Sequence, residues 1–487
     1  MTVTCGIFAL TNMSRPQQEG LIFLTYMTEM NDTITALATP PGEGGISIIR
    51  ISGENALSIG KTLFHSKSQI ENQVPPVQKV LLGEIRDPVS GQIIDEVLFT
   101  WFKKPNSYTG EDVVEISGHG GTLVSTTLLQ LILKQGARLA EPGEFTRRAF
   151  TFGRLDLAQA EAVADLIDAA SEKALNSAVS QLKGGLSKRI NKLFDQLLEV
   201  QAQLEAAIDF SEEGLTFQSR ETTVSQIKKV EKEIISLVQS FQQGKIIHEG
   251  MRIALVGKPN VGKSSLFNAL MQEDRAIVTG MPGTTRDTLE ERIRIKDIHI
   301  AVTDSAGLRE NPGIIEEEGI ERTRNAVTHS DLSLLVFDHS RALDSNDELL
   351  MNEVKDKPRF ILLNKSDLDP QWEKEEIANF CENETVISIS AKTGIGLNNL
   401  KDAIYNFATK GERQGDSIVI TRERHRDHLK QVTIALGSAS KNLNAGYSEE
   451  LIAVDINLAI EHLGAVLGKT FVEDLLDKIF GEFCIGK

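Results

Sequence analysis

The chain has 487 residues, a formal net charge of −17, and 40% hydrophobic and 25% charged residues. At roughly 150 residues per domain, this length predicts about three domains, and the composition excludes collagen-like, disulfide-stapled and wholly disordered chains. The acidic balance excludes a general nucleic-acid coat, so any RNA contact is expected to be local. Three scattered cysteines, Cys5, Cys381 and Cys484, are too few for a zinc cluster and favour a reducing, cytoplasmic location.

Residues 1–30 hold two short apolar runs that are split by the polar stretch from Arg15 to Glu19. Neither run approaches the ~18 to 20 apolar residues of a membrane span, and the order of charges does not fit a signal peptide. We therefore predict an N-terminal extension outside the core, either disordered or preceding the native start. Met27 or Met30 is the alternative first residue.

Residues 31–150 show the pattern of an α+β domain. Four short, β-branched segments bounded by Gly, Pro or Asn predict strands: ISIIRISG, KVLLGEI, IIDEVLFTWF and DVVEIS. The segment TLVSTTLLQLILKQGA has helical length and predicts a helix that ends at Gly136.

Two proline-free tracts predict a helical domain in two parts, over residues 151–250 and 411–487. In the first part, apolar residues at steps of three and four mark one face of a helix: Leu186, Ile190, Leu193, Leu197, Val200, Leu204 and Ile208. A second, looser stripe consists of Val224, Ile227, Ile234, Val238 and Phe241. The two parts flank an insertion.

Strand and helix patterns alternate in the insertion, residues 251–410. The predicted strands are RIALVG, IHIAVTD, LSLLVFD, RFILLN and TVISIS. Such alternation predicts an inserted α/β domain with a parallel sheet, and the loop after its first strand makes this a P-loop (Ras-like) domain. The fold class is thus multidomain, α+β and α/β, with a discontinuous α-helical domain.

The loop after the first of these strands has the G-x-x-x-x-G-K-S pattern, starting at Gly257. Glycines let backbone N–H groups close around phosphates, Lys263 reaches the β and γ oxygens, and the Ser264 hydroxyl ligates Mg²⁺. Lys263 is also a catalytic candidate. The predicted nucleotide-binding residues of this loop are Asn260, Val261, Gly262, Lys263, Ser264 and Ser265.

Three further motifs follow in the order that a GTPase requires: Asp304-Ser305-Ala306-Gly307, Asn364-Lys365-Ser366-Asp367 and Ser390-Ala391-Lys392. Asp304 can reach Mg²⁺ through water, and the Gly307 N–H can meet the γ-phosphate. The Asp367 carboxylate can accept two hydrogen bonds from guanine that adenine cannot offer. Four motifs in register predict GTP binding.

A candidate switch segment lies between the first two motifs: Thr279, Gly280, Met281, Pro282, Gly283, Thr284 and Thr285. Thr284 or Thr285 could ligate Mg²⁺ once a γ-phosphate is present, and a plain polar turn is the alternative. Leu308 after the second motif cannot orient the attacking water, so a group from elsewhere is needed. The glutamates at 316–318 are candidates, or they form the acidic first turn of a helix.

From about Asn31 the chain resembles the family of tRNA modification GTPases MnmE, also called TrmE, over almost its whole length. The match rests on DTITALATPPGEGGISIIRISG, SYTGEDVVEISGHGG, EPGEFTRRAF, LDLAQAEAVADLIDA, the GKPNVGKSS to PGTTRD block, DSAGLRE with GIER, and the terminal FCIGK. Many families share the GTPase motifs. The PPGxGG, HGG, PGEFT and C-x-G-K segments are far more specific.

The resemblance implies a tetrahydrofolate-binding N-terminal domain that also forms a homodimer. With the FAD-dependent partner MnmG, in a heterotetramer, such proteins add a carboxymethylaminomethyl-type group to carbon 5 of wobble uridine (U34) in certain tRNAs. The one-carbon unit comes from 5,10-methylenetetrahydrofolate or a related reduced folate, and GTP hydrolysis drives conformational change. The alternative is a regulatory or ribosome-assembly switch GTPase.

The resemblance also implies roles for single residues. Folate contacts fall on Arg50, Glu115, Arg154 and Lys487, although family members often have Lys at the Arg154 position. Potassium ligands fall on Asn260, the carbonyls of Thr279 and Met281, and the Thr284 region. The catalytic glutamate falls on Glu316, and Cys484 is assigned a role in tRNA modification rather than in GTP hydrolysis.

The densest basic run after the insertion is TRERHRDHLK, residues 421–430. Together with Arg147, Arg148, Lys183, Lys188 and Arg189, it is a candidate surface for tRNA phosphates. The alternative is a solvated helix face.

Overall fold

The computed structural model divides the chain into two compact units, which are described separately. The first contains residues up to Ala164 together with Leu467–Lys487, and the second contains Asp165–Val466. The described residues are 32–67, 74–209, 219–274, 291–304, 324–355, 357–371, 384–409, 418–471 and 473–487. The predicted N-terminal extension, residues 1–30, and the segment 410–417 before the second helical part lie outside them.

The first unit is built on a seven-stranded sheet in the order β3-β4-β5-β6-β2-β1-β7. Its strands are β1 (Ile34–Leu37), β2 (Gly44–Ser52), β3 (Phe64–Ser66), β4 (Val80–Arg86), β5 (Ile93–Phe102), β6 (Val113–Gly120) and β7 (Arg138–Leu139). Neighbours pair antiparallel except β1 and β7. The four segments that the sequence predicts as strands are β2, β4, β5 and β6.

Two helices, α3 (Ala56–Leu63) and α4 (Thr122–Lys134), pack against this sheet. The apolar residues of these helices form a buried core with alternate strand residues such as Ile49, Ile51 and Phe99. This is expected for a sheet that turns one face to the core. The predicted end of α4 is confirmed, because Gly136 takes a left-handed φ of 102° just after the helix.

The C-terminal segment returns to the first unit. This unit also holds α5 (Glu144–Thr151), most of α6 (Leu157–Asp168) and α18 (Glu473–Gly481). The Phe150 ring lies 5.5 Å from that of Phe471 and 6.4 Å from that of Phe480, measured between centroids. The sequence assigns the last residues to the helical domain, whereas these aromatic contacts group them with the N-terminal unit.

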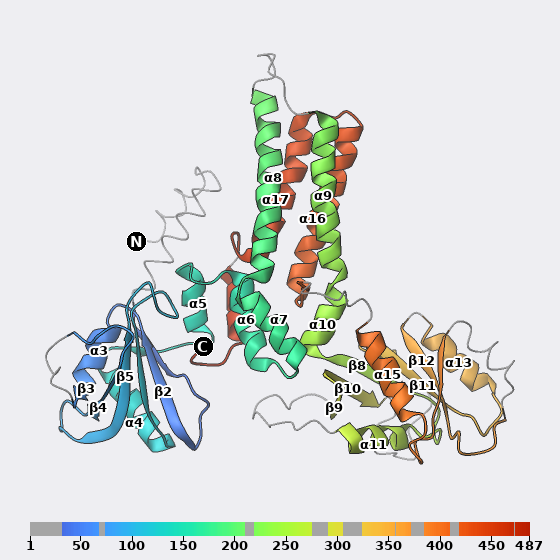
Figure 1. Cartoon of the computed structure of the whole chain (residues 1–487), viewed down its shortest axis with the longest axis horizontal. Helices are drawn as coiled ribbons and strands as arrows, with labels where there is room; N and C mark the ends of the chain where they lie inside the picture. The colour runs from blue at the N-terminus through green and yellow to red at the C-terminus, as the bar shows by residue number, and fades with distance from the viewer. Residues whose placement is uncertain are drawn as a thin grey trace, which may run out of the picture. The chain divides into compact units, whose positions relative to one another are not determined.

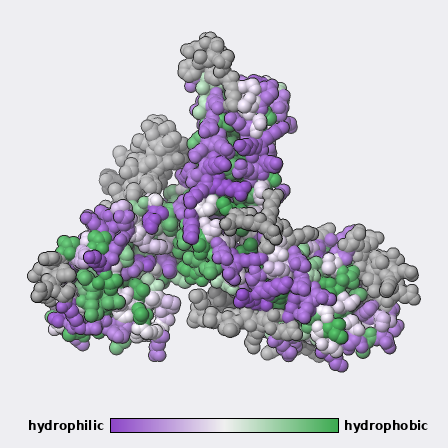
Figure 2. All heavy atoms as spheres, viewed as in Figure 1, coloured by the Kyte–Doolittle hydropathy of each residue, from purple (hydrophilic) through white to green (hydrophobic). Residues whose placement is uncertain are grey.

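In the second unit, four long helices run side by side: α8 (Gly185–Asp209), α9 (Arg220–Gln239), α16 (Glu423–Asn444) and α17 (Glu449–Leu467) (Figure 1). Shorter helices α7 (Glu172–Leu182) and α10 (Phe241–Glu249) accompany them. The visible face of the bundle is largely hydrophilic (Figure 2). No helix among the described residues is both long and apolar enough to cross a lipid bilayer.

The first predicted stripe is buried along α8 from Leu186 to Leu204. The second stripe is partly wrong, because α9 buries Val230 and Leu237, whereas Val224 and Val238 are only half-buried. An α-helix advances 3.6 residues per turn, so the buried face follows Ile227, Val230, Ile234 and Leu237 rather than the looser spacing.

Between α10 and α16 the chain forms a six-stranded sheet in the order β13-β12-β11-β8-β10-β9. Its elements are β8 (Met251–Val256), α11 (Lys263–Asp274), β9 (Glu291–Ile295), β10 (Ile298–Asp304), β11 (Leu332–Asp338), α13 (Ser345–Glu353), β12 (Arg359–Asn364), β13 (Thr385–Ser388) and α15 (Leu397–Ala408). All neighbours are parallel except the edge pair β9–β10, which the sequence does not predict. The predicted multidomain α+β and α/β class is confirmed.

Candidate functional site

A phosphate-type loop leads from the end of β8 into α11. Asn260 and Gly262 both have positive φ, of 64° and 101°. A Cβ at Gly262 would lie 2.2 Å from the Asn364 Nδ2 atom, so only glycine fits there. The loop therefore needs this glycine for both its backbone conformation and its close approach to a second motif.

The Lys263 ammonium is held inside the same loop. Its Nζ donates to the carbonyl oxygens of Gly257 and Lys258, each at 2.8 Å, and the residue is 6% exposed. Ser264 and Ser265 are exposed in the first turn of α11. The backbone N–H groups and the positive end of the dipole at a helix start attract an anion, so the loop is shaped to receive a phosphate chain.

The third and fourth motifs meet beside this loop at the sheet edge where β8, β12 and β13 end. The Asn364 Nδ2 donates to the Val261 carbonyl at 2.7 Å, and its Oδ1 accepts from the Ala391 N–H at 3.0 Å. The Ser390 hydroxyl donates to Asp367 Oδ1 at 2.6 Å and lowers the pKa of that carboxyl. The ionised Asp367 is thus ready to accept hydrogen bonds from a base.

Two residues of the GTPase motifs pair with carboxylates that lie outside all four motifs. Lys258 of the phosphate-type loop pairs with Asp344 and Asp347 at the start of α13. Asp338, the last residue of β11, accepts from Lys365. A polar residue that ends an apolar strand, as Asp338 ends LSLLVFD, is the sequence signal that could have found the second contact.

Several predicted residues lie outside the described residues: Thr279, Gly280, Met281, Pro282, Gly283, Thr284, Thr285, Ser305, Ala306, Gly307 and Glu316. Their predicted roles stay predictions. The backbone of Asp304 ends β10 and pairs with Leu255 of β8, so this residue begins at the same sheet edge as the loop.

A second site lies in the first unit, where Arg50 of β2 stands directly opposite Glu115 of β6. Arg50 Nε and Nη2 lie 2.9 and 2.8 Å from Glu115 Oε1. The guanidinium carbon is also 5.0 Å from the centre of the Tyr108 ring and 5.5 Å from that of Phe145. Both charges are mostly buried, with side chains 14% and 25% exposed, so they form a fixed ionic pair against aromatic rings.

An open hollow beside this pair is lined by Gln78, Phe102, Pro105, Asn106, Ser107, Tyr108 and Arg154. Arg154 is exposed and its Nε donates to the Ser107 carbonyl at 3.3 Å. Tyr108 exchanges a 2.8 Å hydrogen bond with Thr146, and burial raises the pKa of its hydroxyl. The hollow thus connects the predicted Arg154 with the aromatic ring under Arg50.

The C-terminal tail reaches the same place. The Gly486 carbonyl accepts from Arg50 Nη1 at 3.5 Å, and Ile485 forms a β-bridge with Pro142. Gly486 has a φ of 96°, and a Cβ on it would lie 2.3 Å from the Leu37 carbonyl oxygen. Only glycine therefore allows this docking.

The tail carries two predicted functional residues, of which Cys484 is exposed and Lys487 is half-buried. The Cys484 thiol is exposed, while the Cys484 carbonyl accepts from the N–H groups of Gly143 and Lys487 at 3.4 and 3.3 Å. Arg50 and Glu115 thus share one site with the tail that carries Cys484 and Lys487, although over 400 residues separate Arg50 from Gly486.

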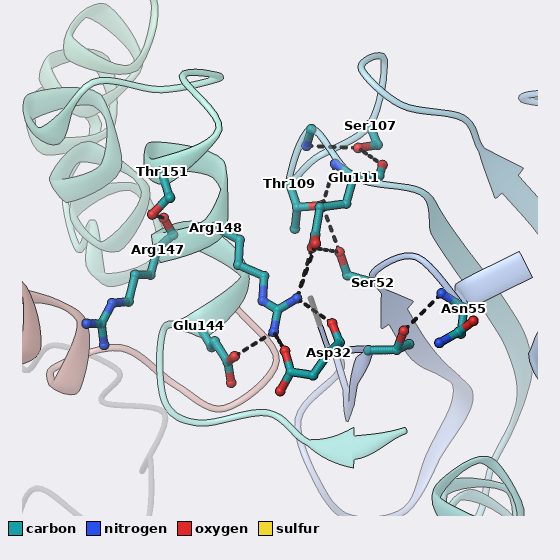
Figure 3. Close-up of polar contacts among 12 residues, drawn as sticks. Asp32, Ser52, Asn55, Ser107, Thr109, Glu111, Glu144, Arg147, Arg148 and Thr151 are labelled. Atoms are coloured by element: carbon teal, nitrogen blue, oxygen red, sulfur yellow. Dashed lines mark hydrogen bonds and ion pairs between the residues drawn. The ribbon is translucent and has the colours of Figure 1, made fainter. Parts of the chain in front are cut away.

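Arg148 is wrongly placed in the candidate tRNA surface, because its side chain is 0% exposed. It points between three carboxylates (Figure 3): Asp32 at 2.5 Å, Glu144 at 3.0 Å and Glu111 at 3.2 Å. Arg147 is mostly buried too and pairs with Asp477 at 2.9 Å. A buried guanidinium needs such partners, and these contacts fix α5 rather than offer charge to an RNA.

In the run at 421–430, Arg422, Arg424 and His425 are turned inward, whereas Lys430 is exposed. Arg422 pairs with Asp165, Arg424 donates to the carbonyls of Ala465 and Val466, and His425 is fully buried. The helix face therefore turns these cations inward. Of the other candidates, Lys183 and Lys188 are exposed, and Arg189 is half-buried near Glu233.

Two family models match the chain. The MnmE helical domain matches residues 157–484, and the GTP-binding protein TrmE N-terminus matches residues 33–154. The tRNA modification GTPase MnmE of Clostridioides difficile (strain 630) is 43% identical over 459 residues, which cover 94% of this chain and 100% of that relative. The protein of the same name from Natranaerobius thermophilus is 44% identical over 462 residues, 95% of this chain and all of the relative.

Solved structures with similarity include the G domain of the T. maritima FeoB iron transporter. It is 27% identical, has a TM-score of 0.26, and covers 32% of this chain and 98% of that one. Aquifex aeolicus Era bound to GDP and AlF4⁻ is 23% identical with a TM-score of 0.26, over 38% of this chain and 66% of that one.

Proposed function

Because the chain belongs to the tRNA modification GTPase MnmE family, it is a GTP hydrolase that acts in tRNA modification, and we propose that it modifies wobble uridine. In this proposal it acts as a homodimer with the FAD-dependent MnmG, in a heterotetramer in the cytoplasm. Together they add a carboxymethylaminomethyl-type group to C5 of U34 in certain tRNAs.

The observation that carries the proposal is the meeting of the Arg50–Glu115 pair with the C-terminal tail. A reduced folate, 5,10-methylenetetrahydrofolate or a relative, would supply the one-carbon unit when bound there. The residues fit it, because Glu115, held by Arg50, can accept from the amino edge of its pterin, and the exposed Arg154 guanidinium at the adjoining hollow can pair with the carboxylates of its glutamate tail. Tyr108 and the hollow that Arg154 lines offer aromatic and basic surface beside them.

The outer face of the N-terminal sheet supports the homodimer. Leu82 of β4 and Leu98 of β5 stand directly opposite each other and are 48% and 45% exposed. Val80, two residues before Leu82 on the same side of β4, is 62% exposed. An exposed apolar row of this kind is typical of a surface that a second subunit covers.

GTP hydrolysis in this proposal needs Mg²⁺ and is stimulated by K⁺. The exposed Ser264 hydroxyl at the phosphate-type loop fits Mg²⁺, which prefers oxygen ligands. Asn260, exposed and left-handed in the loop, offers an amide oxygen for K⁺. Glu316 would orient the attacking water, and Lys263 and Asp367 would hold the phosphates and the guanine.

A folate titration of the full chain tests this function. We expect Arg50→Ala to weaken binding of tetrahydrofolate at least tenfold, because the variant loses the guanidinium that pairs with the Glu115 carboxylate. Isothermal titration calorimetry measures the change. The matched control is Arg86→Ala, which removes an exposed arginine of β4 that pairs only locally with Glu84. The control should bind the folate normally.

Nucleoside analysis of tRNA from cells that carry the same variants gives the second readout. Arg50→Ala should deplete the C5-modified wobble uridine and leave GTP turnover within twofold. If the unaltered chain binds no reduced folate and its loss leaves tRNA nucleosides unchanged, the regulatory or ribosome-assembly switch GTPase is the correct function.

A further inference from the structure

We propose that Asp338 is a positioning residue for guanine nucleotide binding. It holds the Lys365 side chain and so fixes the turn that carries Asn364 and Asp367. Asp338 belongs to none of the four GTPase motifs. It lies on the strand next to the one that leads into the turn.

The sheet topology brings the two together. Asp338 ends β11 and is in direct register with Asn364, the last residue of the neighbouring parallel strand β12. Lys365 follows at once, and its Nζ donates to Asp338 Oδ2 at 2.6 Å. The Asp338 side chain is 5% exposed, against 31% for Lys365. A charge-assisted hydrogen bond on a buried carboxylate is stronger than an exposed ion pair.

The carboxylate itself is fixed on its other sides. Asp338 Oδ1 accepts from the Ser340 hydroxyl at 2.6 Å and from the Ser340 N–H at 3.1 Å, and Oδ2 also accepts from Arg341 Nε at 2.9 Å. Burial opposes ionisation, but the bonds from Lys365, Ser340 and Arg341 hold the pKa of Asp338 well below its ordinary value. Asp338 is therefore a rigid anion to which a lysine can be tied.

The tied turn is conformationally strained. Lys365 has a φ of 65°, a region that few residues other than glycine adopt, and such a backbone persists only where its surroundings hold it. The Ser366 N–H, which donates to the Ile389 carbonyl at 3.0 Å, is a second restraint. Loss of the Asp338 bond would leave the Lys365 side chain free and would favour relaxation of the turn.

Relaxation of the turn would disturb recognition of the base. The Asp367 carboxylate accepts from the Ser390 hydroxyl, and its direction also depends on the backbone that carries it. Asn364, at the other end of the turn, bridges Val261 and Ala391. Asp338 contacts Lys365 and acts through it, so it should set nucleotide affinity and base discrimination while the rate of the chemical step stays the same.

The test is Asp338→Asn in the full chain, because the amide keeps the shape and removes the charge. We expect the KM for GTP and the Kd for fluorescently labelled GDP to rise about tenfold, with kcat within twofold. The preference for GTP over ITP should also fall, because ITP lacks the amino group that Asp367 accepts from. A merely structural role would lower the melting temperature without changing the GTP-to-ITP ratio.

The matched control is Asp331→Asn, just before the start of β11. Its carboxylate also bonds across to β8, where Oδ2 accepts from the Arg252 N–H at 2.9 Å, but it lies at the opposite edge of the sheet. The control should leave KM, Kd and base preference unchanged. If Asp338→Asn does not fold, Ser340→Ala keeps the carboxylate and removes one of its bonds, and it should raise the KM about threefold.

Three results would overturn the proposal. The first is a GTP KM in Asp338→Asn within twofold of the unaltered enzyme. The second is an unchanged GTP-to-ITP ratio in that variant. The third, where only Ser340→Ala folds, is a KM equal to that of Asp331→Asn.

Discussion

The two candidate sites of this chain are assembled in different ways. In the GTPase domain the recognised residues stand in short motifs, each directly after a strand, and parallel strands deliver them to one sheet edge. In the first unit, Arg50 and Glu115 come from two strands, Tyr108 from a loop and Gly486 from the other end of the chain. The residues of the first site thus come from short sequence motifs, whereas the second site forms only when the C-terminal tail docks.

Because the two sites are assembled differently, they should tolerate different changes. A phosphate-type loop keeps its shape through bonds within a few residues, as Lys263 does with Gly257 and Lys258. The tail site depends on one left-handed glycine, Gly486, pressed against Leu37. A change in one site should therefore leave the other site working, and three experiments test this independence.

The largest expected effect is that of Cys484→Ser on tRNA. We expect the C5-modified wobble uridine to fall at least a hundredfold in cells, because the exposed thiol lies on the docked tail. GTP turnover should stay within twofold. The measurement is nucleoside analysis beside a GTPase assay, and modified uridine at the level of unaltered cells would remove the thiol from the proposed function.

The next effect concerns the GTPase site alone. Replacing K⁺ by Na⁺ should slow GTP hydrolysis about tenfold, and Asn260→Ala should abolish the difference between the two salts. Turnover in matched chloride buffers measures both. The control is Asn268→Ala, an exposed asparagine on α11. Equal rates in the two salts for the unaltered chain would contradict a potassium site at Asn260, and folate binding should not change in either variant.

The third experiment concerns the stability of the fold and a histidine that belongs to neither site. His248 Nε2 is 2.8 Å from Asp165 Oδ1, and this hydrogen bond raises the pKa of the imidazole. A raised folded-state pKa stabilises the fold fully below the unfolded value of about 6.5, and the gain disappears as pH rises through the folded-state pKa. We expect His248→Gln to remove this pH-dependent part of the stability, which is fully present below about pH 6.5 and declines as the pH rises.

Urea unfolding midpoints at several pH values measure this effect, with the exposed His329→Gln as the control. A variant that keeps the full pH dependence of the unaltered chain would show that the Asp165 contact contributes nothing. GTP turnover and folate binding should remain unchanged, since His248 belongs to neither candidate site.

Features that depend on neighbours along the chain could be predicted from the residues alone. Periodicity predicted the buried face of α8, and β-branched runs predicted β2, β4, β5 and β6. The GTPase motifs could be read because each needs fixed residue types at fixed spacing around a phosphate or a base. Resemblance to a family supplied Arg50 and Glu115, which strand patterns alone would have treated as ordinary residues.

Which charges face water and which distant residues meet could be seen only in the folded chain. Arg148 and Arg424 look like surface cations in sequence, yet carboxylates and carbonyls from remote segments enclose them. Asp338 joins the GTPase site because β11 and β12 lie in register, and Gly486 joins Arg50 because the tail returns to β1. Such contacts depend on pairing and packing between segments far apart in the chain, and no local pattern of residue types encodes them.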